Sequence, residues 1–470
     1  MTSQTGLPTD TEDSWAWTEF GEPALGDARR TGRVVDLART LAARPAASLP
    51  EACTDPAQLK AAYRFFSNAA VTPEALLASH VAATRHRIAQ VPVVLAVQDT
   101  TELDYTSHPA TTGLGYLNDT KHRGLLVHST LAITPERLPL GLLAQQVWTR
   151  EALGQRATRK TRAITEKESH KWLLSLAAVQ AARAASPDTH LISVGDREAD
   201  VYDLFLVERP AGVDLLVRAA WDRRVTAPQQ HLWATVAAAP VAGTAVVTIP
   251  RRPGQPARTA TLTVRFCPVT LRPPRRRSQD KLPPVSVWAG WVRELYPPAG
   301  TEPIEWLLVT TCPVRAAEQA LECVAWYACR WGIEIWHKIL KSGCQIEARQ
   351  LETGERLQRC LTLYSVIAWR VLYATILART VPDLPCTALL ETAEWEALYC
   401  ATFHTPTPPE TPPTLRQAVR WVAQLGGFLA RAQDGEPGVL TLWKGFQHLA
   451  DLTAMYRIMK PPLLRHVGNA

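Results

Sequence analysis

Residues 327–341 read Tyr-Ala-Cys-Arg-Trp-Gly-Ile-Glu-Ile-Trp-His-Lys-Ile-Leu-Lys, and as one helix they have two opposed faces. At ~100° per residue, five polar side chains share a stripe roughly 80° wide: Tyr327, Arg330, Glu334, Lys338 and Lys341. The opposite face carries Cys329, Ile333, Trp336 and Leu340. A packed helix needs only the apolar stripe. The polar stripe, one carboxylate among cations and a phenol, therefore predicts a site that binds a metal ion and a polyanion together.

The size and composition are those of a globular protein with two or three domains. The chain has 470 residues, of which 46% are hydrophobic and 20% charged. The Met-Thr-Ser-Gln-Thr-Gly start has no signal pattern, and Arg370 interrupts the longest apolar run, near residues 363–377. Nine cysteines occur singly, without a Cys-x2-Cys pair. We therefore expect reduced thiols, no zinc ribbon, no membrane segment and a cytoplasmic location.

The positive charge is clustered and rich in arginine. The net charge is +7, and clusters occur at residues 29–30, 156–162, 223–224, 251–252 and 275–277. Such clustering favours a polyanionic partner such as nucleic acid. Solvated surface faces are the alternative that composition alone leaves open.

The order of the predicted elements gives a mixed α/β chain with helical ends. Residues 1–72 read as helical, including amphipathic stretches at 34–43 and 56–67. From about residue 90 the pattern is α/β, with strands at 91–97, 124–133, 138–147 and 191–195 and helices at 167–185 and 201–207. Residues 219–300 alternate in the manner of strands and read as a β-rich insertion, followed by a core strand at 305–310.

The C-terminal part is again predicted to be helical. Helices are expected at 354–378, 415–425 and 441–459, with a proline-rich linker at 405–413.

Three acidic residues lie at positions where catalytic groups are common. Asp99 and Asp196 follow two predicted strands, the usual place for chemistry in an open α/β sheet, and Glu334 lies on the predicted helix. Each also has an ordinary alternative: Asp99 as a turn residue, Asp196 as a helix N-cap, and Glu334 as an ion-pair partner of Lys338. Together they are enough carboxylates to bind two magnesium ions.

These motifs resemble one family closely. Tyr327-x2-Arg330-x3-Glu334-x6-Lys341 is similar to the signature of the IS-four family of bacterial insertion-sequence transposases, the Tn5-like group. Asp99-Thr-Thr and Asp196-Arg-Glu-Ala-Asp resemble its other two acidic motifs. The similarity runs from about Phe20 to Met459.

The resemblance implies an architecture and a catalytic triad. It implies an α/β, RNase H-like catalytic domain at 73–378 with the β-rich insertion at about 219–300. Residues 1–72 would be a helical domain that binds transposon ends, and 379–470 a helical dimerisation domain. Asp99, Asp196 and Glu334 would form a DDE triad that binds two Mg²⁺ ions, with Mn²⁺ able to substitute.

The resemblance also implies DNA contacts. Phosphates of the transposon end would meet Tyr327, Arg330, Lys338 and Lys341, while Arg29 and Arg30 belong to the end-recognition unit. Trp306 would stack on a flipped base near a hairpin end, and Trp331 and Arg218 match other positions that handle the hairpin. At Gly332 the family more often has a long basic side chain.

The predicted function is cut-and-paste DNA transposition. The partners would be double-stranded DNA, both terminal inverted repeats and target, and a second copy of the chain, with the protein on the bacterial nucleoid when it binds DNA. Two alternatives remain: a metal-dependent nuclease without strand transfer, and a non-catalytic DNA-binding derivative of a transposase.

Overall fold

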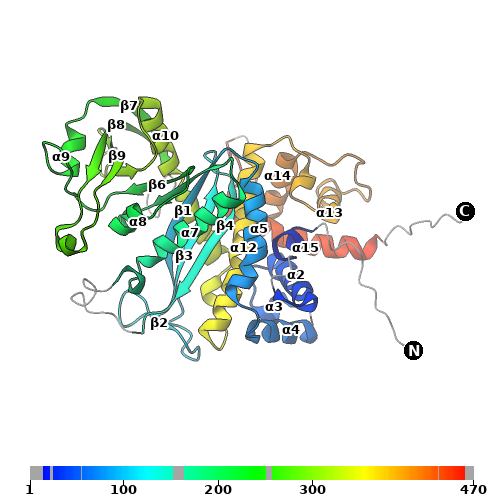
Figure 1. Ribbon diagram of the computed structural model, residues 1–470. Coiled ribbons are helices and arrows are strands. Elements are labelled where there is room, and N and C mark those ends of the chain that lie inside the picture. Colours follow the sequence, from blue (N-terminus) through cyan, green and yellow to red (C-terminus); the bar gives the residue numbers. More distant parts are fainter. Residues whose placement is uncertain are drawn as a thin grey trace, which may run out of the picture. The chain divides into compact units, whose positions relative to one another are not determined.

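The computed structural model describes residues 14–21, 25–53, 55–151, 163–249, 257–431 and 433–460 (Figure 1). They belong to two compact units. One comprises residues 1–80, 108–113 and 336–470, and the other residues 81–107 and 114–335. The predicted basic clusters at 156–162 and 251–252 lie outside the described residues.

A ten-stranded mixed sheet is the framework of the second unit. The strand order is β2-β3-β1-β5-β6-β10-β9-β8-β7, with β4 paired to β3. The strands are β1 (Val93–Asp104), β2 (Gly115–Tyr116), β3 (Arg123–Ile133), β4 (Pro139–Trp148), β5 (His190–Gly195), β6 (Val213–Arg218), β7 (Val241–Ile249), β8 (Arg258–Leu271), β9 (Val285–Glu294) and β10 (Glu305–Thr310). The helices of this unit include α7 (His170–Ala185), α8 (Tyr202–Leu206), α9 (Leu232–Ala237) and α10 (Ala317–Ala328).

Three neighbouring strands, β1, β5 and β6, run parallel. Their registers run from Val93↔His190 to Val97↔Val194 and from Leu191↔Val213 to Gly195↔Val217. The strands are short apolar runs, as expected where both faces of a sheet are covered. Helix α7 lies along one face, where Trp172, Leu176 and Val179 enter the same hydrophobic core as the strands (Figure 1). The predicted antiparallel pair of β3 and β4 is confirmed.

The β-rich segment is a continuation of this sheet. Residues 219–300 contain the strands β7, β8 and β9, in agreement with the predicted β-rich insertion. Strand β10 pairs with β9 along the whole length of β10, from Glu305↔Arg293 to Thr310↔Trp288. The backbone groups of the core strand β10 are thereby paired on both sides, by β6 and by β9.

Two predicted element boundaries are wrong at the candidate site. Strand β1 does not end at Val97; it continues through Asp99 to Asp104 because β3 pairs with it as far as Asp104↔Gly124. The predicted helix at 327–341 is interrupted as well. Helix α10 ends at Ala328, α11 (Trp331–Lys338) follows, and a π-helical turn occupies Ile339–Gly343.

The interruption between α10 and α11 has a local cause. The amides of Cys329 and Arg330 donate to carbonyls only three residues back, at 3.0 and 3.1 Å, which tightens the turn. Gly332 then approaches β3 closely, since a Cβ there would lie 2.7 Å from Cδ1 of Ile133. The apolar face nevertheless forms as predicted, with Cys329, Ile333 and Trp336 all buried.

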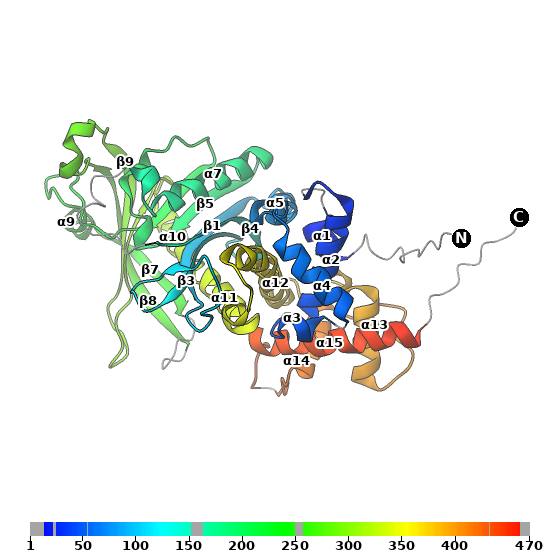
Figure 2. The ribbon, with the colours of Figure 1, turned by 90° about the horizontal axis from the view of Figure 1, so that it is seen from below.

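The first unit is helical. Its helices are α1 (Trp15–Phe20), α2 (Ala28–Ala43), α3 (Leu49–Ala52), α4 (Pro56–Ser67), α12 (Gly354–Thr380), α13 (Thr392–Phe403), α14 (Leu415–Leu425) and α15 (Val439–Met459). Helix α5 (Pro73–Ile88) and helix α11 each contain a boundary between the units. Figure 2 shows α14 and α15 side by side, in agreement with their contacts. Helix α13 has no counterpart in the sequence prediction.

Helix α12 is the core of the helical unit. Its most apolar window has a mean hydropathy of 1.6, enough in length and composition for a membrane span, but 83% of that window is buried. The helix is therefore packed as a core helix of this unit. Two buried arginines, one in this helix and one just before it, donate to backbone carbonyls of the N-terminal segment. Arg359 donates to Val71 (2.6 Å) and Phe66 (3.1 Å), and Arg349 donates to Pro45 and Ala47.

Gly195, at the end of β5, tests the packing of the sheet against α7 and the turn after β5. A Cβ on Gly195 would lie 2.4 Å from Cβ of Ala199 and 3.2 Å from the Trp172 ring. We expect Gly195→Ala to lower the free energy of unfolding by about 1–3 kcal/mol, because a buried contact must be forced apart. Gly243→Ala is the control, since its nearest neighbour lies at 3.8 Å, and it should change stability by less than about 0.5 kcal/mol. Urea unfolding measures both, and equal effects would contradict the packing.

Candidate active site

Asp99 lies on β1 where its parallel neighbour has already ended. Pairing with β5 stops at Val97, whereas pairing with β3 continues, so that Asp99 lies opposite Ser129. Its Oδ1 accepts a hydrogen bond from the amide of Thr100 at 2.9 Å, and its side chain is 22% exposed. The turn alternative is therefore wrong, because Asp99 has strand conformation.

Asp196 directly follows the last residue of β5. It caps the short 3-10 turn Arg197–Ala199 by accepting the amide of Glu198 at 2.8 Å, so the capping alternative describes a real contact. Strands β1 and β5 are adjacent and parallel, and both acids therefore emerge at the same edge of the sheet. Their charges influence each other, since Asp196 raises the pKa of Asp99.

Arg330 joins two of the three acids. Its guanidinium lies 3.6 Å from Oδ2 of Asp99 and forms an ion pair with Glu334 four residues along the chain. Glu334 thus pairs with Arg330 and not with Lys338 as the alternative expected. The Arg330 side chain is only 14% exposed. Burial alone would lower the pKa of Arg330, but Tyr327, Asp99 and Glu334 together hold it above its usual value.

Asp99 is the acid whose protonation is most perturbed. Burial raises its pKa to about 6; Arg330 opposes this shift, whereas Asp196 and Glu334 add to it. The carboxyl is thus held in a place where its negative charge is costly until further positive charge is supplied.

The donor set suits a hard divalent cation. Three carboxylates offer only oxygen, the ligand that Mg²⁺ prefers. Among the described residues, the ligand oxygens of these three acids do not all lie within 4.8 Å of one another. The ligand atoms of His190, Asp214 and Cys312 do. Positive charge beside Asp99 and Glu334 comes from Arg330 in this conformation.

Aromatic side chains pack behind the acids. The ring of Trp306 makes edge contacts with Tyr327 (centroids 5.0 Å apart) and Trp331 (5.8 Å), and all three residues are buried. Trp306 itself is 4% exposed, so base stacking would need the ring to leave this packing. Arg218, at the end of β6, donates to the carbonyl of Glu305 at 2.9 Å and interacts with Tyr327, whose pKa burial raises.

A second aspartate of the Asp196 motif has a structural contact that the sequence prediction did not assign. Asp200 is 4% exposed and accepts hydrogen bonds from the amides of Ala220 (2.8 Å) and Trp221 (3.1 Å). Arg223 donates to the same carboxylate at 2.8 and 2.6 Å. Asp200 therefore fixes the start of the β-rich segment. The only sequence signal for this contact was the Arg223-Arg224 pair, in a chain that is basic as a whole.

The remaining predicted DNA contacts lie in the helical unit. Arg29 is exposed on the first turn of α2, and Arg30 donates to the carbonyl of Leu25 at 3.0 Å. Lys338 is exposed, and Lys341 forms an ion pair with Glu347 at 3.3 Å. On α4, a shallow groove is lined in part by Lys60, Tyr63 and Arg64, which the prediction did not include.

Two family models match the ends of the chain. Residues 12–71 match "Transposase DNA-binding", and residues 366–460 match "Transposase Tn5 dimerisation domain". Together, the two matches support a Tn5-like transposase. The first match includes Arg29, Arg30 and the groove on α4, and the second includes most of α12 and all of α13 to α15. The first match supports DNA as a partner, and the second supports a dimer.

The charge balance at Asp99 predicts that removing its charge by Asp99→Asn increases stability, by an amount that depends on pH. The pKa of Asp99 is about 6 in the folded transposase and 3.8 in a model compound. The folded state therefore favours the protonated carboxyl, and ionisation costs stability progressively as the pH rises from about 4 to about 6. In the absence of metal, Asp99→Asn should raise the free energy of unfolding at pH 8 by up to about 3 kcal/mol.

The same substitution should give little gain at pH 4, where Asp99 is already protonated. Urea unfolding in EDTA at the two pH values measures the difference, with the exposed Asp188→Asn as control. An equal effect of Asp99→Asn at both pH values would refute this account of the charge.

The contacts of Asp200 predict a stability defect. Its side chain is 1% exposed and that of Arg223 10%. Asp200→Asn leaves this arginine without its counter-charge, and we expect a loss of about 3 kcal/mol in thermal or urea unfolding. Asp203→Asn breaks the more exposed pair with Arg277 and should cost less than about 1 kcal/mol. A fully stable Asp200→Asn variant would show that the contact is dispensable.

Proposed function

We propose that this Tn5-like transposase is a cut-and-paste DDE enzyme, with Asp99, Asp196 and Glu334 as its catalytic acids. The observation that carries the proposal is the gathering of these acids around Arg330, in a chain whose ends match DNA-binding and dimerisation models. The acids come from two strand ends and a helix, so their proximity is a property of the fold.

The strand order supports an RNase H-like core. The five strands β4-β3-β1-β5-β6 combine two antiparallel pairings with two parallel ones. Asp99 lies on the central strand and Asp196 follows its parallel neighbour. The β-rich segment enters after β6 and returns through β10, so that it lengthens the sheet without interrupting this core.

Magnesium ions would supply activation of an attacking oxygen and stabilisation of the leaving oxygen. Asp99, Asp196 and Glu334 would hold them, and Mn²⁺ would substitute. The all-oxygen donor set fits, and the raised pKa of Asp99 indicates a place where added positive charge is favourable.

Arg330 would exchange partners when DNA binds. In the described conformation it neutralises part of the charge on Asp99 and Glu334. A scissile phosphate offers the guanidinium two oxygens in a bidentate geometry. Transfer of Arg330 to the phosphate would position the substrate and free both acids for metal ions in one event. Tyr327 would add a hydroxyl donor, and Lys338 and Lys341 would add charge along the DNA backbone.

The proposed reaction course follows from the family. Water would attack the phosphodiester at each element end, and the released 3′-hydroxyl would attack the opposite strand to form a hairpin. A second water would open the hairpin, after which the 3′ end would attack target DNA. The matched dimerisation region would bring the two ends together.

The decisive experiment uses DNA that carries the inverted repeats flanking the coding sequence. With Mg²⁺, we expect nicked, hairpin and strand-transfer products on gels. Asp196→Ala should reduce cleavage by at least ~10³-fold, the equivalent of several kcal/mol of lost charge stabilisation, while binding to the same DNA persists.

Glu198→Gln is the matched control. Glu198 lies two residues away, is 65% exposed and pairs with Lys171 at 2.9 Å, so its loss should leave cleavage within about threefold. Equal cleavage by wild type and Asp196→Ala would overturn the triad. Cleavage without any integration product would favour the nuclease, and DNA binding without cleavage the non-catalytic derivative.

A further inference from the structure

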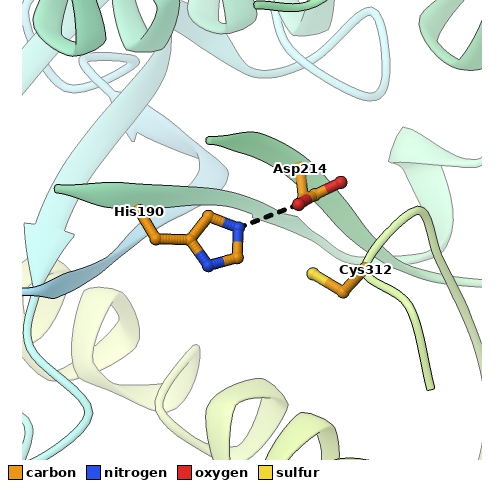
Figure 3. A group of neighbouring side chains, drawn as sticks. All are labelled: His190, Asp214 and Cys312. Atoms are coloured by element: carbon orange, nitrogen blue, oxygen red, sulfur yellow. Dashed lines mark hydrogen bonds and ion pairs between the residues drawn. The ribbon is translucent and has the colours of Figure 1, made fainter. Parts of the chain in front are cut away.

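A second cluster of potential ligands lies at the opposite ends of the strands that support the candidate active site. His190 begins β5, Asp214 is the second residue of β6, and Cys312 comes two residues after β10. Their ligand atoms all lie within 4.8 Å of one another. Figure 3 shows the sulfur of Cys312 directed toward the imidazole and the carboxylate. Asp196 is six residues along β5 from His190, about 20 Å in an extended strand.

The contacts around the cluster already orient its members. Nε2 of His190 lies 2.8 Å from Oδ2 of Asp214. The hydroxyl of Thr311 donates to the other carboxylate oxygen, Oδ1, at 2.6 Å. The oxygen Oδ1 of Asp214 therefore accepts a hydrogen bond from Thr311, and Oδ2 faces the histidine. This arrangement resembles the supporting hydrogen bonds that orient metal ligands.

We propose that His190, Asp214 and Cys312 bind a structural zinc ion. The donor set of one nitrogen, one oxygen and one sulfur suits Zn²⁺ and does not suit Mg²⁺, which selects oxygen. In a tetrahedral zinc site, pairs of ligand atoms are separated by about 3.3–3.8 Å. Wider pairs in the cluster, up to 4.8 Å, would therefore contract, and the His190–Asp214 pair at 2.8 Å would lengthen slightly. The thiol proton leaves when zinc binds, and the site charge is then close to zero.

A further sulfur close enough to interact with the cluster belongs to Cys323 on α10. It interacts electrostatically with both Cys312 and Asp214 and can complete the coordination, as can a water molecule. Two other charged groups face the cluster: Arg209 acts on Asp214, and Glu322 acts on Cys323. They carry opposite signs.

A catalytic cysteine explains the cluster less well. Cys312 is 5% exposed, and burial raises the pKa of its thiol far above its ordinary value. Without a metal ion the group is a protonated, inaccessible thiol and not a nucleophile.

The ion would tie together the three strands that also carry candidate active-site residues. Their other ends lead to Asp196 on β5, Arg218 on β6 and Trp306 on β10. Fixing the near ends of these strands would hold their register, and the two sites would share a scaffold without sharing a ligand. The inference does not rest on the proposed function.

The test measures zinc in the full-length chain, purified without a histidine tag and in excess Mg²⁺. We expect about one zinc per chain by mass spectrometry, and after exchange with Co²⁺ a thiolate-to-cobalt charge-transfer band with tetrahedral d–d bands. Cys312→Ser and His190→Gln should each weaken zinc binding by more than about tenfold. Removal of zinc should lower the melting temperature.

Two controls separate this site from others. Asp196→Ala should keep its zinc, which excludes the acidic cluster as the binding place. His122→Gln should also keep it, because the exposed His122–Asp119 pair has no described thiol partner. If the ligand variants do not fold, the cobalt spectrum of the wild-type chain decides. The proposal would be overturned if the sulfur charge-transfer band were absent. It would also be overturned if Cys312→Ser and His190→Gln bound zinc as tightly as the wild-type chain.

Discussion

The buried charge of Arg330 is the interaction on which the candidate active site depends. Asp99, Asp196 and Glu334 repel one another, and burial of Asp99 adds to the cost of its charge. Without a nearby cation the fold would have to protonate an acid or spread the acids apart. Arg330 contacts two of the acids and is itself largely buried, so it stabilises the cluster in the absence of metal. A phosphate or a metal ion must compete with these contacts.

Parallel pairing of β1, β5 and β6 explains how two separate groups of potential ligands form, one at each end of these strands. Parallel neighbours end at one edge of a sheet, which brings Asp99 and Asp196 together from positions almost a hundred residues apart in the chain. The same geometry collects His190 and Asp214 at the other edge, where β10 delivers Cys312. Oxygen ligands gather at one edge and a mixed nitrogen, oxygen and sulfur set at the other.

Local patterns predicted much of the fold. The amphipathic helices at 56–67 and 415–425 begin and end at the predicted residues, because capping residues and spacing agree there. Long-range pairing was less accessible. The extension of β1 to Asp104 depends on β3, and the attachment of the β-rich segment depends on β10; neither leaves a periodic signal. Helix α13 was missed because its apolar residues do not gather on one face.

The site shows the same division. The periodicity at 327–341 identified Arg330 and Glu334 as neighbours, and their ion pair is present. It could not show the break after Ala328, where the amides of Cys329 and Arg330 donate to carbonyls three residues back, because such a tight turn leaves the spacing of polar and apolar residues unchanged. Nor could it show that Asp200, only four residues after Asp196, binds an arginine and two amides, since those partners lie beyond the next strand.

In the helical unit, two buried arginines that precede the dimerisation match bind carbonyls of the DNA-binding match. The guanidinium of Arg359 donates to the carbonyls of Phe66 and Val71, both within the DNA-binding match. Arg349 reaches Pro45 and Ala47 in the same way. Both arginines are more than nine-tenths buried, so loss of the N-terminal segment would leave two buried cations without acceptors, at a cost of several kcal/mol. The N-terminal segment and the start of α12 therefore stabilise each other, and a change in either one acts on the stability of the other.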